Sequence, residues 1–137
     1  MKFRIEARGD YLLAEVHGRE TAADMREFLL ALKMACTEHA CPRILISVHA
    51  SRPIFKFDDH GLGTFVNELV TPPCRIALVG DSSELNHAHD YIELVARQRQ
   101  MDVKSFRDLS IAQQWLREPQ AAPDAQAGTS QPARRAR

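Results

Sequence analysis

The segment RILISVH, residues 43–49, has the β-branched composition of a central β-strand. Successive side chains of a strand point to opposite faces of its sheet. One face of this segment is therefore wholly apolar, with Ile44, Ile46 and Val48. On the other face, Leu45 is flanked by polar residues. The segment thus predicts a sheet with one apolar face and one mixed face.

The preceding predicted strand repeats this contrast. Leu12, Ala14 and Val16 share one face. Leu13 and Glu15 share the other. A doubly wound sheet would be apolar on both faces of its central strands. We therefore expect helices mainly on one face, with the mixed face partly solvated or covered by the second subunit of a homodimer.

Apolar periodicity and turn residues predict elements in the order β-β-α-β-α-β-α-β-α. The predicted strands span residues 2–7, 11–16, 44–48, 75–79 and 103–106. The predicted helices begin at residues that favour helix N-caps, namely Thr21, Asp58 or Asp59, Asp81 and Asp108. This order predicts an α/β fold: a mostly parallel five-stranded sheet with an N-terminal antiparallel hairpin and four helices, mainly on one face.

The composition is that of one globular domain. The 18 basic and 18 acidic residues cancel formally, which argues against a dedicated nucleic-acid binder. No stretch reaches the roughly 18 consecutive apolar residues of a membrane span, and the first residues lack the apolar segment of a secretory signal. Three cysteines without regular spacing fit a reducing compartment. We therefore expect a cytoplasmic protein without membrane insertion.

Residues 119–137 differ in composition from the rest of the chain. They contain no leucine, isoleucine, valine or aromatic residue. Such a segment has little apolar area to offset the loss of chain entropy on folding. We expect an α/β domain over residues 1–118 and a disordered C-terminal tail over residues 119–137.

Three local motifs follow one another along the chain: DDHGLG at 58–63, IALVGD at 76–81 and VKSFRD at 103–108. With the order of the elements over residues 1–117, they resemble the STAS domain, the fold of bacterial anti-sigma factor antagonists. The similarity is greatest to the stage II sporulation AA-like branch, which is also likened to the Sec14 lipid-binding fold. The resemblance implies a stepwise β-α superhelix with helices mostly on one side of the sheet.

The first motif departs from the pattern that the resemblance implies. The antagonists carry Asp-Ser-Ser-Gly-Leu-Gly there, and the first serine is their phosphorylation switch. In this chain Asp58 takes the aspartate position, Asp59 the switch serine and His60 the second serine. Asp59 supplies a permanent negative charge where the helix dipole favours one. We expect a site that is no longer under kinase control.

A contact surface is predicted in this motif and in the loop before it. Ile54, Phe55 and Phe57 lie within four residues, beside Arg52. Such a loop cluster is either part of the core or an exposed patch, and aromatic residues beside an arginine suit an interface. The predicted partner-binding residues are Arg52, Ile54, Phe55, Phe57, Asp58, Asp59, His60, Gly61 and Gly63. The leading interpretation is a non-catalytic regulatory or protein-interaction module whose partner is another protein.

Two other functions are weaker alternatives. The first is a small carrier for an apolar or lipid ligand, by analogy with Sec14-like proteins; it requires a closed apolar cavity behind Phe55, Phe57 and Phe65. The second is an enzyme that uses Asp58, Asp59 and His60. Helix capping explains the two aspartates more simply, and the sequence places no third catalytic partner.

The sequence predicts no metal site, cofactor or catalytic residue. Cys36, His39 and Cys41 lack the paired spacing of structural zinc ligands, and Cys36 lies on the apolar stripe of its predicted helix. His87 and His89 are about 200° apart around a helix and cannot bind one ion together. We expect one of these two histidines to be partly buried and the other exposed.

The tail beyond Glu118 should be dispensable for folding. Truncation after Glu118 is expected to leave the thermal midpoint nearly unchanged, because the removed residues have almost no apolar area to bury. Thermal unfolding followed by circular dichroism tests this prediction. A truncated protein that unfolds at a clearly lower temperature would contradict it.

Overall fold

The computed structural model describes residues 1–40, 42–52, 75–98 and 100–118. Within these residues lie five strands and three helices. The strands are β1 (Lys2–Ala7), β2 (Leu12–His17), β3 (Arg43–His49), β4 (Arg75–Gly80) and β5 (Asp102–Phe106). The helices are α1 (Ala22–His39), α3 (Ser83–Gln98) and α4 (Leu109–Arg117). None of these helices has both the length and the apolar character that crossing a membrane requires.

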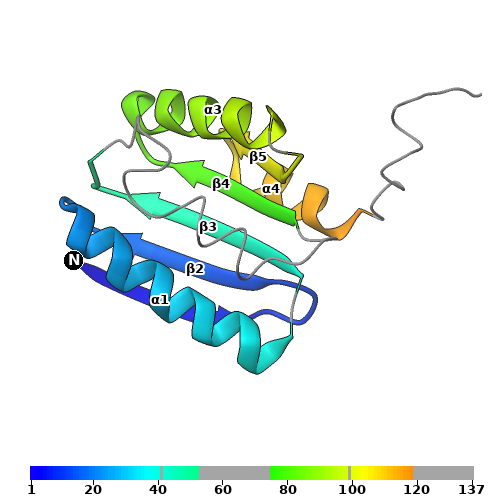
Figure 1. The fold of residues 1–137 in the computed structure, drawn as a ribbon. Coiled ribbons are helices and arrows are strands. Elements are labelled where there is room, and N and C mark those ends of the chain that lie inside the picture. Colours follow the sequence, from blue (N-terminus) through cyan, green and yellow to red (C-terminus); the bar gives the residue numbers. More distant parts are fainter. Residues whose placement is uncertain (41, 53–74, 99, 119–137) are drawn as a thin grey trace, which may run out of the picture.

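The five strands form one sheet in the order β1-β2-β3-β4-β5 (Figure 1). β1 is antiparallel to β2, and β2 to β5 are parallel to one another. The register places Leu12 opposite Ile44 and Leu13 opposite Leu45, so that the apolar faces of β2 and β3 are continuous. The predicted α/β fold, with a mostly parallel sheet and an N-terminal antiparallel hairpin, is confirmed.

The wholly apolar face of the sheet packs against α1 and α3. α1 lies over β1 and β2, and α3 over β4 and β5 (Figure 1). The predicted cap of α1 is a capping box: Thr21 Oγ1 accepts a hydrogen bond from the Asp24 N–H, and the Asp24 carboxylate accepts one from the Thr21 N–H. The buried residues of α1 recur at helical spacing and are Met25, Phe28, Leu29, Leu32 and Cys36.

The mixed face of the sheet is covered over its apolar part by α4. Ala112 and Leu116 are fully buried in a cluster with Leu45 and its neighbours on β2 and β4. The expectation that these apolar residues are solvated or need a second subunit is therefore wrong: Leu45 is 0% exposed within one chain. The helix that follows the last strand folds back across the sheet and buries them. A homodimer remains a prediction, but Leu45 no longer supports it.

Arg75 fastens α4 to the sheet. Its Nε donates a hydrogen bond to Asp102 Oδ2 (3.1 Å), and its Nη1 donates one to the Trp115 carbonyl (2.6 Å). The guanidinium also lies 4.5 Å from the centre of the Trp115 ring, a cation–π distance. Arg75 is only 8% exposed, so burying its charge costs free energy, and these contacts offset that cost.

Truncation of the Leu116 side chain tests whether α4 packs against the apolar part of the mixed face. Leu116→Ala should lower the free energy of unfolding by about 2–5 kcal/mol, since the side chain is fully buried. Ile111→Ala, on the same helix but 54% exposed, is the matched control and should cost less than about 0.5 kcal/mol. Urea denaturation measures both values. Equal costs for the two variants would show that α4 is not docked as described.

Candidate functional site

The carboxyl ends of β2 and β3 lead into two segments that run side by side. The Gly18 N–H donates to the His49 carbonyl (3.1 Å), and the Arg52 N–H donates to the Arg19 carbonyl (2.8 Å). The Arg19 N–H donates to Ser51 Oγ (3.0 Å). Arg52, the first residue of the predicted contact surface, is therefore exposed at the carboxyl edge of the sheet.

The rest of the predicted contact surface lies outside the described residues. This applies to Ile54, Phe55, Phe57, Asp58, Asp59, His60, Gly61 and Gly63. It also applies to the helix predicted to begin at Asp58 or Asp59 and to the predicted tail over residues 119–137. The contribution of these residues to one surface remains a prediction.

The N-terminus of α3 differs from the prediction. Asp81 does not cap the helix: its Oδ2 accepts a hydrogen bond from the Ala50 N–H (3.0 Å), across the ends of β3 and β4. Ser82 is the cap, since its Oγ accepts from the Leu85 N–H (3.1 Å). Ala50 has a φ of 47°, in the left-handed region. Asp81 thus joins the loop after β3 to the end of β4.

Two buried ionisable side chains lie beneath this edge. Arg19 is 4% exposed, its guanidinium donates to the Arg52 carbonyl, and burial lowers its pKa to about 10. His89 on α3 is 3% exposed, and its pKa is lowered to about 4, first by burial and then by the Arg19 cation. Among the described residues, Nδ1 of His89 has no hydrogen-bond partner. His87 is exposed, so one histidine is buried and the other is not, as expected.

Two hollows of the described residues bear on the carrier hypothesis. Arg19 and His89 line a cavity of about 30 Å³ together with apolar side chains of α1, α3 and the sheet. This volume holds water but not a lipid, because sites for small organic ligands measure about 300–1,000 Å³.

The second hollow, of about 470 Å³ at the start of α3, is open to solvent, and polar residues such as Asp81, Ser82 and Arg107 line it. Neither hollow suits an apolar ligand. The space behind Phe55, Phe57 and Phe65 lies outside the described residues.

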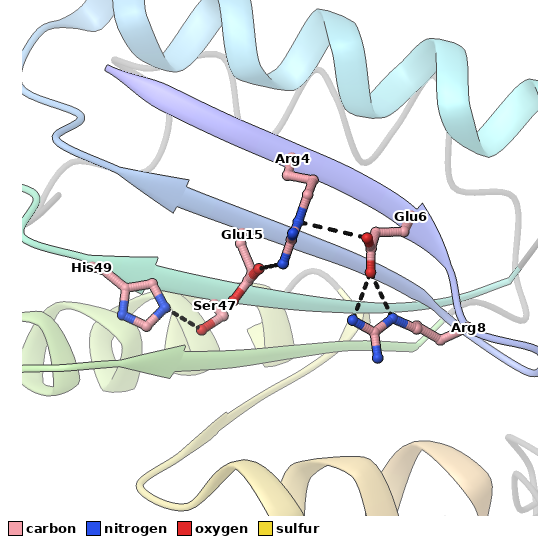
Figure 2. A network of polar contacts seen from close by, with 6 residues as sticks. All are labelled: Arg4, Glu6, Arg8, Glu15, Ser47 and His49. Carbon is pink, nitrogen blue, oxygen red and sulfur yellow. Dashed lines mark hydrogen bonds and ion pairs between the residues drawn. The ribbon is translucent and has the colours of Figure 1, made fainter.

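A polar network occupies the part of the mixed face that α4 leaves uncovered (Figure 2). Arg4 donates to Glu15 (2.6 Å) and forms a longer ion pair with Glu6 (3.6 Å), which also pairs with Arg8 (2.6 Å). These residues lie on β1, on β2 and at the turn between them. The two arginines are exposed and the two glutamates are partly exposed, so each ion pair contributes little to stability. The network instead gives this face a defined arrangement of charges.

The network continues on β3 through Ser47 and His49. Ser47 Oγ lies 2.8 Å from Nε2 of His49. The His49 ring stacks on that of His17, with the ring centres 4.5 Å apart and the planes 11° apart. The stacking follows from the sheet register, which pairs Glu15 with Ser47 and His17 with His49. Sequence reasoning missed this cluster, although the alternation of β2 and β3 places all four residues on the mixed face.

Ser47, His49 and Asp81 follow the order of a nucleophile, a base and an acid, but their geometry does not fit that role. Nδ1 of His49 is 3.8 Å from Asp81 Oδ2, too far for a hydrogen bond. The same carboxylate oxygen accepts from Ala50. Ser47 lies within a strand and is 6% exposed, so a substrate carbonyl has no access to its hydroxyl. We interpret the pair of Ser47 and His49 as packing of the polar face.

Comparison with known proteins shows a similarity of fold. No protein-family profile matches the chain, and no curated protein matches it by sequence. Among solved structures, the fold is similar to that of an anti-sigma factor antagonist from Mycobacterium paratuberculosis, with a TM-score of 0.60 and 14% sequence identity over 85% of this chain and 94% of that chain. The chain has the fold of an anti-sigma factor antagonist. The fold implied by the resemblance of its motifs is thereby confirmed.

The buried His89 should make the protein sensitive to acid. The folded state keeps His89 neutral down to a pKa of about 4, whereas the unfolded chain protonates it near 6.5. The unfolded state binds more protons between these values, so stability falls as pH drops from 6.5 to 4, by about 3 kcal/mol in total. In urea denaturation across this range, His89→Gln should flatten the pH dependence relative to the parent protein. His87→Ala, an exposed control, should leave it unchanged. An unaltered slope in His89→Gln would assign the acid sensitivity to other groups.

Proposed function

We infer that the protein is a non-catalytic regulatory protein that acts by binding another protein. The observation that carries this proposal is the fold, which is shared over most of both chains with an anti-sigma factor antagonist. The described hollows add support, because neither is an apolar cavity of the size that a carrier needs. The cytoplasm is the proposed compartment, and the proposed partner is a protein of the anti-sigma factor type.

The proposed contact surface begins at the carboxyl edge of the sheet. Arg52 is exposed there. Its backbone is held by two hydrogen bonds: its N–H donates to the Arg19 carbonyl, and its carbonyl accepts from the Arg19 guanidinium. A rigid anchor of this kind lowers the entropy that a contact residue loses on binding. The surface continues, on this proposal, through Ile54, Phe55 and Phe57 into residues 58–63.

Asp59 stands where the anti-sigma factor antagonists carry the serine that their kinase phosphorylates. A phosphorylated serine carries a charge of about −1.5 to −2, whereas an aspartate carries −1 at all times near neutral pH. An anti-sigma kinase therefore finds no hydroxyl to phosphorylate at this position, and the charge there does not change. We propose that the partner is bound or refused constitutively, with no phosphorylation cycle at residues 58–63.

Binding to purified anti-sigma factors, measured by isothermal titration calorimetry, tests the proposal. At least one such protein should bind, and Arg52→Glu and Phe55→Asp should each weaken binding by about tenfold or more, the effect of losing an interface anchor. Arg97→Glu makes the same charge change on α3, where Arg97 pairs only with Glu93 in the described structure, and should leave binding unchanged.

The same samples distinguish the alternatives. After incubation with ATP and a bound anti-sigma kinase, mass spectrometry should find residues 58–63 unmodified; phosphate on Asp59 would refute the constitutive state. A protein that binds no anti-sigma factor but purifies with a lipid in native mass spectrometry would support the carrier instead.

A further inference from the structure

The uncovered part of the mixed face brings together three side chains of a metal-binding type. Glu15 and His17 are two residues apart on β2 and therefore point to the same side of the sheet. His49 lies directly opposite His17 on β3. The potential ligand atoms of these three residues all lie within 4.8 Å of one another. His17 is exposed, and Glu15 and His49 are half-buried, so an ion can reach them from solvent.

The chemistry of this donor set selects a class of ion. Two imidazoles and one carboxylate are ligands of zinc and other divalent transition metals, which bind at open sites with three protein ligands and a water molecule. Calcium and magnesium prefer sites made wholly of oxygen ligands. We propose that Glu15, His17 and His49 form a site for a divalent transition metal of the zinc type. The site is distinct from the proposed protein-binding surface and does not depend on it.

The surrounding structure fixes the backbone of all three ligands and orients the side chain of His49. β2 and β3 are paired in parallel along their whole length, so the backbone positions of Glu15, His17 and His49 are fixed relative to one another. Ser47 Oγ lies 2.8 Å from Nε2 of His49. A histidine that binds a metal through one ring nitrogen usually has a hydrogen bond at the other. Nδ1 of the same ring lies 3.8 Å from Asp81 Oδ2, so an oxygen atom lies near each ring nitrogen, and the contact that metal binding does not displace can orient the ring.

Metal binding requires two local rearrangements. A histidine nitrogen binds an ion in the plane of its ring, so the rings of His17 and His49, which are stacked with their planes 11° apart, must tilt toward each other before both can reach one ion at about 2.0–2.1 Å. Arg4 must also release Glu15, with which it forms an ion pair of 2.6 Å. The Arg4 side chain is 63% exposed and has Glu6 as a second partner, so this release has a small cost. The Arg4 cation and a metal ion thus compete for one carboxylate.

The test uses the full chain without a histidine tag, treated with chelator and dialysed. Titration with ZnCl₂ in a calorimeter should give one ion per chain, and Co²⁺ should give the visible absorption bands of a tetrahedral site. MgCl₂ should give no binding. His17→Ala, His49→Ala and Glu15→Gln should each weaken zinc binding by about tenfold or more. His87→Ala and His39→Ala remove a histidine elsewhere and should leave the affinity unchanged.

Arg4→Ala provides the decisive contrast, because it removes the competitor for Glu15 and should tighten zinc binding. Nuclear magnetic resonance of the parent protein adds a readout that does not depend on any variant folding: zinc should shift amide signals of β2 and β3 first. Zinc binding that is unaffected by His17→Ala and His49→Ala, or shifts confined to the region of His39, would overturn the proposal. No zinc binding by the parent protein would overturn it as well.

Discussion

Strand β3 is buried on both faces, and each face has a different cover. Ile44 and Val48 belong to the core cluster that also contains side chains of α1 and α3, while Leu45 belongs to the cluster that contains side chains of α4. Because side chains alternate along this one strand, the chain must bury apolar residues on both faces of the sheet. The short α4 covers only part of the mixed face. The polar network of Figure 2 lies on the same face, along β1 and over the carboxyl halves of β2 and β3.

The elements of the sheet could be predicted from the sequence because local patterns determine them. Strand alternation, Thr21 with Asp24, and Asp108 as a cap are all signals within a few residues, and the structure contains each of them. The side of the sheet that α4 covers could not be predicted. A helix between two parallel strands is constrained by the handedness of the crossover, but α4 follows β5, and no strand after it among the residues that the structure describes fixes its side.

The candidate sites were harder to predict, because they depend on contacts between distant segments. Glu15 and His49 become neighbours only through the register of β2 with β3, and no local pattern specifies that register. The cap of α3 shows the same limit on a smaller scale. Asp81 and Ser82 are both suitable capping residues, and the hydrogen bond between Asp81 and Ala50 assigns the role to Ser82.

The strand order has a consequence for how the protein is made. Each strand lies beside its neighbours in sequence, so the sheet can grow along one edge as the chain leaves the ribosome, without waiting for a distant strand. The cover of Leu45 comes much later, since α4 is the last element described. A nascent chain therefore exposes the apolar part of the mixed face until α4 has been synthesised. Transiently exposed apolar surface favours aggregation, and docking of α4 ends this exposure.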